Sequence, residues 1–155
     1  MPTDLHIRVS LADQALYLQE GEQVLRQYSV STSKFGPGTE EGSNKTPLGN
    51  FRICEKFGDT EAPYTIFRAR LNEGLWDPAE PCTDDLVLTR ILRLEGLDTD
   101  NLNTYGRYIY IHGTNHEAEL GNPASQGCIR MSNQNVIDLY DRSPLGTPIT
   151  ISLHS

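Results

Sequence analysis

Residues 111–133 read IHGTNHEAELGNPASQGCIRMSN and connect an apolar run to the start of a helical pattern. His112 closes the apolar run, and the Gly113-Thr114 pair directly after it predicts a turn. Cys128 follows sixteen residues after His112, within Ser-Gln-Gly-Cys, and an arginine stands two positions further on. The stretch therefore predicts a strand end carrying a histidine, a polar loop, and an extended turn carrying a cysteine.

One helix is expected, directly after this stretch. Ser132 or Asn133 can cap it, an apolar stripe runs through residues 136–140, and Pro144 ends it. Elsewhere, alternation of apolar and polar residues predicts strands, at residues 5–11, 15–19, 23–31, 51–56, 64–69, 86–94, 105–112 and 148–153. Two segments rich in Gly, Pro and polar residues predict loops, at 34–51 and 72–85. The pattern predicts a mostly β domain with one main helix.

The length and the charge limit the kind of protein this is. A chain of 155 residues predicts one domain, residues 1–155, long enough to bury a core without disulfides. The 21 acidic residues against 13 basic ones give a formal net charge of −8. Such a balance disfavours a nucleic acid partner and docking to an anionic membrane.

The cysteines and the N-terminus bear on the compartment. The odd number of cysteines, Cys54, Cys82 and Cys128, cannot all pair, and their spacing fits no metal motif. Unpaired cysteines are typical of a reducing compartment. The first residues show no basic region followed by an apolar one, and no run is long enough to span a bilayer. We expect a cytoplasmic protein, or a periplasmic one if a signal has been removed.

Cys128 is the candidate nucleophile, whereas Cys54 and Cys82 are expected to be inert apolar residues. Gly127 before it permits a close backbone approach, and Ser125 and Gln126 add polar groups that are unusual beside an inert thiol. The helix expected a few residues later would bring amide groups and a positive helix end near the sulfur. Both lower the pKa of a thiol, so we expect a reactive thiolate.

His112 is the candidate base, because a rigid strand end can position an imidazole well. A backbone carbonyl could fix its tautomer. The other histidines, His6, His116 and His154, are expected on the surface. A metal site built from His112, His116 and Glu117 is a weaker alternative, since the intervening residues are turn-like and His-Glu-x-x-His is missing. We expect neither a metal nor another cofactor.

Arg130 stands two residues after Cys128 and should therefore face the same side of an extended segment. It could bind a substrate carboxylate as a fork, or it could form a salt bridge with one of the many acidic residues. Both alternatives stay open from the sequence. Acyl transfer also needs hydrogen-bond donors for an oxyanion, and the amides of Gly127 and Cys128 are the natural candidates.

Taken together, residues 111–114 (IHGT) and 125–131 (SQGCIRM) resemble the signature of the YkuD-type L,D-transpeptidase catalytic domain. Residues 45–51 (KTPLGNF) match that family's Thr-Pro-x-Gly-x-Phe turn. The resemblance implies a β-sandwich that is partly barrel-like. It also implies a cysteine nucleophile that attacks the amide between an L-configured centre and the terminal D-alanine of a peptidoglycan tetrapeptide.

The resemblance also implies roles for individual residues. They are Cys128 as nucleophile, His112 as base, the Gly113 carbonyl as the group that orients the imidazole, the Gly127 and Cys128 amides as oxyanion donors, and Ser125 and Arg130 as residues that organise the pocket. Gln126 departs from the family, which usually has histidine there. Glutamine cannot take up a proton at neutral pH, so any help to the base from that position is missing.

Three functions remain open. The first is a cytosolic murein tetrapeptide L,D-carboxypeptidase that releases D-alanine during peptidoglycan recycling, which the missing signal favours. The second is an L,D-transpeptidase that forms 3→3 crosslinks or exchanges D-amino acids. The third is a domain that only binds muropeptides. The resemblance further implies that a carbapenem would form an adduct at Cys128.

Overall fold

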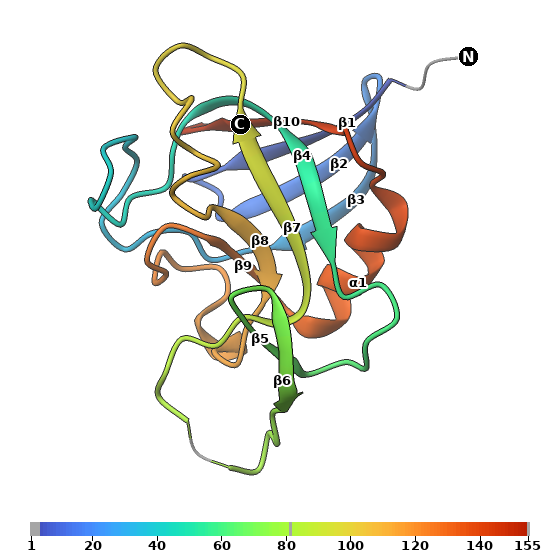
Figure 1. The fold of residues 1–155 in the computed structure, drawn as a ribbon. Coiled ribbons are helices and arrows are strands. Elements are labelled where there is room, and N and C mark those ends of the chain that lie inside the picture. The colour runs from blue at the N-terminus through green and yellow to red at the C-terminus, as the bar shows by residue number, and fades with distance from the viewer. Residues whose placement is uncertain (1–3, 81, 155) are drawn as a thin grey trace.

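The computed structural model describes residues 4–80 and 82–154. Within these residues the chain forms ten strands and one α-helix (Figure 1). The strands are β1 Leu5–Ser10, β2 Ala15–Glu20, β3 Gln23–Ser29, β4 Gly49–Phe57, β5 Thr65–Arg68, β6 Leu71–Leu75, β7 Leu88–Gly96, β8 Tyr110–Gly113, β9 Ile129–Met131 and β10 Pro148–Ser152. The helix α1 spans Asn133–Arg142, and a short 3-10 helix spans Glu117–Glu119.

The strands form a single branched sheet. Its main path runs β3-β2-β1-β10-β4-β7-β5-β6, and β8 and β9 extend from β7 as a second branch. The pairs β1–β10 and β8–β9 are parallel, and the other pairs are antiparallel. In Figure 1 the sheet curves so that β1–β3 lie across from β8 and β9, with α1 at one side. The three strands β7, β8 and β9 therefore lie at the centre of the fold.

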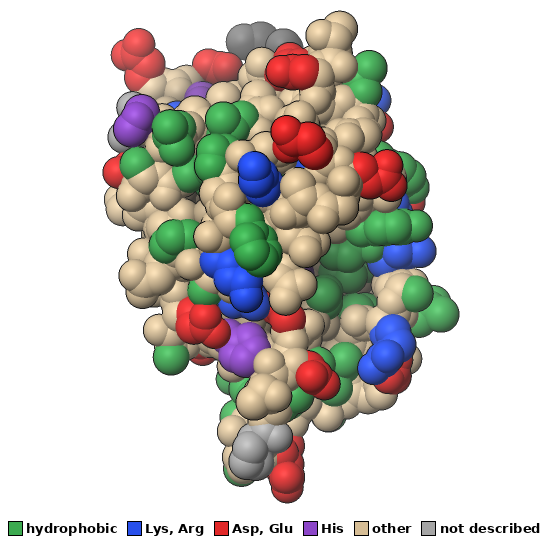
Figure 2. All heavy atoms as spheres, turned by 90° about the vertical axis from the view of Figure 1, so that its left-hand side faces the viewer, with side chains coloured by type: hydrophobic (Ala, Val, Ile, Leu, Met, Phe, Trp, Pro, Cys, Tyr) green, Lys and Arg blue, Asp and Glu red, His purple; other side chains and the backbone are tan. Residues whose placement is uncertain are grey.

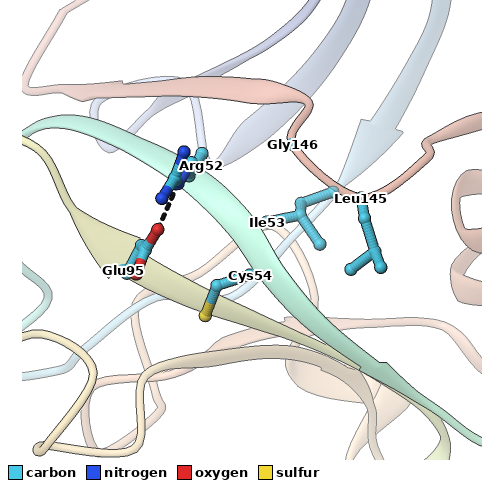
Figure 3. A pocket seen from close by; sticks show the side chains of 6 residues that line it. All are labelled: Arg52, Ile53, Cys54, Glu95, Leu145 and Gly146. Carbon is cyan, nitrogen blue, oxygen red and sulfur yellow. Dashed lines mark hydrogen bonds and ion pairs between the residues drawn. The ribbon is translucent and has the colours of Figure 1, made fainter.

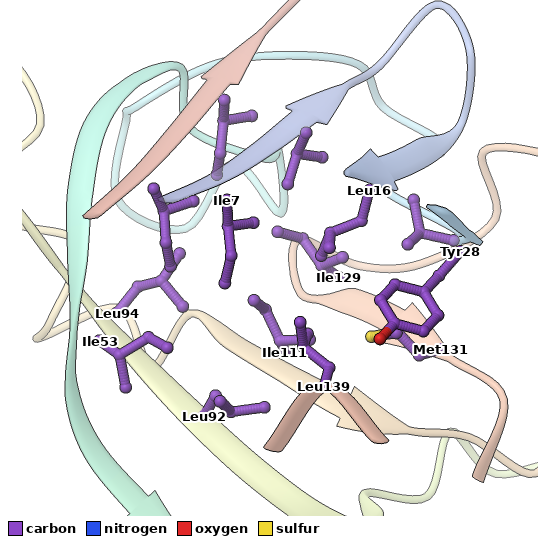
Figure 4. Packing of buried hydrophobic residues seen from close by; sticks show 14 of the residues in the cluster. Ile7, Leu16, Tyr28, Ile53, Leu92, Leu94, Ile111, Ile129, Met131 and Leu139 are labelled. Carbon is purple, nitrogen blue, oxygen red and sulfur yellow. The ribbon is translucent and has the colours of Figure 1, made fainter. Parts of the chain in front are cut away.

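The main core fills the space inside this curve. Side chains from both ends of the sheet meet there with the apolar face of α1, as Figure 4 shows for Ile7, Leu16, Leu92, Ile111 and Leu139. All of these side chains are fully buried. Their burial, at roughly 1.5–3 kcal/mol for each large apolar side chain, holds the strands in place.

The register of β7, β8 and β9 gives this part of the sheet two different faces. Leu92, Ile111 and Ile129 are cross-strand neighbours and face the main core. Ile91, His112 and Arg130 are the next set of neighbours and must face the opposite side. On that side Ile91 packs with Phe67 of β5 and with Tyr110, under the β5–β6 hairpin. A histidine and an arginine are thus buried on the face away from the main core.

The predicted fold class is confirmed, and so is the helix after Cys128. Ser132 caps α1 by accepting a hydrogen bond from the Asn135 amide, and Pro144 follows the helix end. Within the described residues, no helix has the length and the apolar character that crossing a bilayer requires.

Two predicted boundaries were wrong. Residues 72–75 lie in a predicted loop but belong to β6, because this strand pairs with β5 although all five of its residues are exposed. Residues 105–109 were predicted as strand but form turns, with Tyr108 at a φ of 56°. Tyr105 and Tyr108 are consequently exposed at the start of β8 rather than buried within a sheet.

The Gly96→Ala substitution is expected to destabilise the fold. Gly96 ends β7, and a Cβ there would overlap the carbonyl oxygen of Asn101, whose side chain anchors the following loop to Leu48 and Asn50. Overpacking against backbone should lower the free energy of unfolding by about 1–3 kcal/mol, as measured by urea denaturation. Gly106→Ala is the matched control, because the nearest atom to its Cβ would lie 3.7 Å away. Equal stability of the two variants would contradict the expected overlap.

Candidate active site

The end of β8 and the start of β9 bring the two candidate reactive residues together. The amide of Tyr110 lies 3.4 Å from the Cys128 sulfur, and the thiol donates to the Tyr108 carbonyl at 3.4 Å. His112 and Arg130 are paired residues on the parallel strands β8 and β9. Because residues two positions apart share a face of a strand, His112 and Cys128 lie on the same face of neighbouring segments.

His112 is held as a neutral imidazole by burial and by one backbone carbonyl. Its side chain is 1% exposed, and Nδ1 lies 2.6 Å from the carbonyl oxygen of Gly113. A carbonyl can only accept, so this bond places the proton on Nδ1 and leaves the Nε2 lone pair free. Burial, the main cause, lowers the pKa of the imidazole below 6.5. The imidazole is therefore neutral at neutral pH.

Gly113 fits its position for a steric reason. A Cβ at Gly113 would lie 2.5 Å from Oδ1 of Asn133 and 2.7 Å from the Leu88 carbonyl oxygen. Asn133 in turn donates to the Thr114 carbonyl and accepts from the hydroxyl of Thr89. The first residue of α1 thus packs against the strand end that carries His112.

The expected lowering of the Cys128 pKa was wrong. Burial raises the pKa of the thiol to about 11, and this outweighs the opposing effects of the Tyr110 amide, Arg130 and Arg107. The start of α1 does little to lower the pKa of the thiol. The amides of Asn135 and Asn133 in its first turn already donate to the Ser132 hydroxyl and to the Glu117 carboxylate. Part of the Cys128 surface stays accessible, but the resting residue is a neutral thiol.

Hydrogen bonds within residues 125–128 hold the turn before β9. The Ser125 hydroxyl donates to the Cys128 carbonyl at 2.6 Å and accepts a longer bond, 3.3 Å, from the Gly127 amide. Gly127 has a φ of +122°, which side chains rarely tolerate. The Ser125 hydroxyl therefore holds the turn through bonds to its own backbone.

Thr46 supports the same turn from a distant segment. Its buried hydroxyl donates to the Gly127 carbonyl at 3.0 Å and accepts from the Ser33 amide at 3.0 Å. The hydrogen bond fixes the plane of the Gly127–Cys128 peptide, and with it the direction of the Cys128 amide. The family resemblance includes the segment around Thr46, but the sequence predicts no role for this residue.

Arg130 is 4% exposed and forms the salt bridge that was one of its two expected roles. Its Nη2 lies 3.1 Å from Asp85 Oδ1, and its Nη1 lies 3.9 Å from Glu119 Oε2. Among the described residues, Nε and Nη1 have no hydrogen-bond partner. Arg130 therefore has N–H groups near the Cys128 thiol that could donate hydrogen bonds to another group.

Two recesses are lined by residues that neighbour or contact this group, although neither is lined by Cys128 or His112. One, of about 330 Å³, is lined by Gln126, Arg107 and Tyr108 and by the loop at residues 41–44. The other, of about 230 Å³, is lined by Asp85 and by residues 66–68 of β5. Figure 2 shows acidic side chains scattered over one face of the molecule and a hollow lined by hydrophobic side chains at its right-hand edge. Arg107, Tyr108 and Asp85 received no role from the sequence.

A larger hollow, of about 460 Å³, lies away from these residues (Figure 3). Its lining includes Cys54, Arg52 and Glu95 and none of the residues described above. Burial, the main cause, raises the pKa of the Cys54 thiol, which donates to the Arg93 carbonyl. The carboxylate in its lining, Glu95, forms an ion pair with Arg52.

The residues of the weaker metal alternative do not converge. His112 is bonded to Gly113, whereas His116 has Nε2 3.0 Å from the Asp84 carbonyl and Nδ1 3.6 Å from Glu119. Over residues 4–80 and 82–154, no group of three His, Cys, Asp or Glu side chains is arranged to hold a metal ion.

A histidine and a cysteine on adjacent parallel strand ends, with an anchored Gly-Cys turn, define a cysteine acyl-transfer type of site. The family model described as YkuD, the L,D-transpeptidase catalytic domain, matches residues 4–151. The putative L,D-transpeptidase YqjB of Bacillus subtilis is 32% identical over 152 residues, 98% of this chain and 73% of that protein. The chain belongs to the L,D-transpeptidase catalytic domain family.

Other relatives agree with this assignment. The putative L,D-transpeptidase YkuD of Bacillus subtilis is 27% identical, over 95% of this chain and 65% of that protein. An L,D-transpeptidase from Mycobacterium smegmatis has a TM-score of 0.62 at 18% identity, over 97% of this chain and 59% of that one. One from Xylanimonas cellulosilytica has a TM-score of 0.64 at 20% identity, over 98% and 62%. The structures establish the fold, and the chain spans about three fifths of their length.

The pKa of Cys128 predicts how its alkylation depends on pH. Iodoacetamide reacts with the thiolate, and a pKa raised to about 11 keeps the thiol protonated through neutral pH. The rate at Cys128, followed by peptide mass spectrometry, should rise about tenfold per pH unit up to pH ~10. Free cysteine, measured in parallel, should level off near pH 9. A plateau for Cys128 below pH 8 would show a preformed thiolate instead.

Replacement of Thr46 should weaken the fold and the turn together. Thr46→Val removes a buried hydroxyl and leaves the Gly127 carbonyl and the Ser33 amide without a partner. The loss should be about 1–3 kcal/mol in the free energy of unfolding, measured by chemical denaturation. Thr46→Ser keeps the hydroxyl and should retain most of the stability. If valine and serine behave alike, the hydroxyl does not hold this turn.

Proposed function

We propose that this domain is an acyl-transfer enzyme that cleaves the amide between an L-configured centre and the terminal D-alanine of a peptidoglycan tetrapeptide. The observation that carries the proposal is the placement of Cys128 and His112 on one face of the β8–β9 branch, beside surface recesses. Membership of the L,D-transpeptidase catalytic domain family supports the type of bond.

In the proposed reaction Nε2 of His112 takes the proton of the Cys128 thiol as the sulfur attacks the scissile carbonyl carbon. The tetrahedral oxyanion is bound by the Cys128 amide, and by the Gly127 amide if this gives up its long bond to Ser125. The C–N bond then breaks, and His112 passes the proton to the departing amine of D-alanine. A thioester on Cys128 remains.

The acceptor decides the overall reaction. Attack by an amine gives transpeptidation, which the names of the relatives support. Attack by water gives L,D-carboxypeptidation of the tetrapeptide, as in cytoplasmic peptidoglycan recycling. The partly accessible thiol supports water as a second acceptor.

A carbapenem is proposed to acylate the same thiol. One neighbour of the same fold is the L,D-transpeptidase LdtMt1 in complex with imipenem, and another is L,D-transpeptidase 3 of Mycobacterium tuberculosis with a faropenem-derived adduct. For this chain, intact-mass spectrometry after incubation with imipenem serves as a titration of the nucleophile. It does not distinguish the two acceptors.

Product analysis tests the proposed function. Purified protein is incubated with disaccharide tetrapeptide under reducing conditions, with and without an added D-amino acid, and the products are identified by mass spectrometry. Release of D-alanine with tripeptide indicates hydrolysis, whereas exchanged peptide or a 3→3 dimer indicates transpeptidation. Cys128→Ala should abolish both, and His112→Gln should lower the rate by about 10²–10⁴-fold. Unchanged activity of Cys128→Ala would disprove the assigned nucleophile.

A further inference from the structure

Arg70 lies at the tip of the β5–β6 hairpin. Arg68 pairs with Leu71, so Ala69 and Arg70 form a two-residue turn, with φ values of 48° and 67°. Two left-handed residues in such a loop are typical of a type I′ turn, which usually uses asparagine and glycine. An alanine and an arginine in these positions are held there by the surrounding structure.

The arginine reaches from this turn to the strand beside the nucleophile. Its Nη1 donates to the hydroxyl of Tyr110 at 3.0 Å, and its guanidinium lies 5.4 Å from the ring centre of Tyr108. Both tyrosines also contact the thiol, since the Tyr110 amide and the Tyr108 carbonyl are hydrogen-bonded to Cys128. Arg70 is thus linked to the site through two side chains whose backbone holds the sulfur.

The charge of Arg70 is not neutralised. Among the residues that the structure describes, no carboxylate lies within 4.0 Å of it. The same holds for Arg8, Arg90 and Arg107, whereas six arginines each have such a partner: Arg26, Arg52, Arg68, Arg93, Arg130 and Arg142. The nearby acid Glu55 is bonded to Arg93 instead. The protein has a net charge of −8, and Arg70 is partly exposed without an acidic partner. Its guanidinium can therefore bind an anion from outside the protein.

The separation between Arg70 and Cys128 suits contact with a neighbouring group of the substrate rather than with the bond that is cleaved. One tyrosine side chain separates Arg70 from the segment that holds the sulfur, and an extended peptide advances about 3.3–3.6 Å per residue. A group on a neighbouring centre of the stem peptide can therefore reach Arg70 while the scissile carbonyl is at Cys128. Tyr110 occupies Nη1, which leaves other donors of the guanidinium for an incoming group.

We propose that Arg70 is a specificity-determining residue that binds a free carboxylate of the peptide next to the scissile amide. Stem peptides carry either a carboxylate or a carboxamide at such centres, and Arg70 would select the carboxylate form. Arginine binds carboxylates through short charge-assisted hydrogen bonds that a neutral amide cannot match. The inference rests on the proposed function for the identity of the ligand but not on turnover.

Binding in the Cys128→Ala background tests the proposal without catalysis. Dissociation constants are measured by calorimetry for a tetrapeptide with free side carboxylates and for the same peptide with those groups amidated. The carboxylate form should bind about tenfold more tightly at low salt, and the preference should shrink as salt is added. Adding Arg70→Gln should remove the preference by weakening only the carboxylate form, and Arg70→Lys should restore part of it.

Arg142→Gln is the matched control, because Arg142 lies on α1, lines neither recess and pairs with Asp138. It should leave both dissociation constants unchanged. Equal binding of the two peptides, failure of both to bind, or an equal loss for both on Arg70→Gln would each overturn the role of Arg70. The proposed function fails separately, when the protein with Cys128 intact turns over neither peptide.

Discussion

The register of the parallel pair β8–β9 is the constraint on which the site depends. It places Ile111 beside Ile129 toward the main core and His112 beside Arg130 toward the other face. A slip of either strand by one residue would exchange these faces. The apolar core therefore fixes the position of the imidazole, because burying Ile111 and Ile129 forces His112 to the side where Cys128 lies.

Cys128 is held by its own turn and by two distant segments of the chain. Ser125 supports its turn from within, Thr46 from the loop before β4, and Tyr110 from β8. Arg107 in turn fastens that loop through the Lys45 carbonyl. Reactive groups need such support, since small displacements strongly reduce the rate of a reaction between positioned groups.

The sequence predicted the features that depend on neighbouring residues. Alternation at residues 86–94 and the capped stripe after Ser132 led to β7 and α1, and the Ser-Gln-Gly-Cys turn led to Cys128. Prediction from the sequence failed where contacts between distant residues determine the structure. Strand β6 exists because it pairs with β5, Thr46 matters because a loop folds back on Gly127, and burial by the whole fold sets the Cys128 pKa. The roles of the site residues in catalysis remain predictions.

A neutral thiol beside a neutral imidazole is a sensible resting state for such a site. Arg130 and Arg107 both favour the thiolate, yet burial keeps the sulfur protonated until a substrate arrives. In the proposed reaction, transfer of the proton to His112 would develop negative charge on the sulfur and then on the oxyanion, close to Arg130, Arg107 and the backbone amides. Interactions that strengthen only as charge develops lower the barrier more than interactions already satisfied in the ground state. In the proposed reaction, Arg130 and Arg107 would therefore favour the transition state over the resting enzyme.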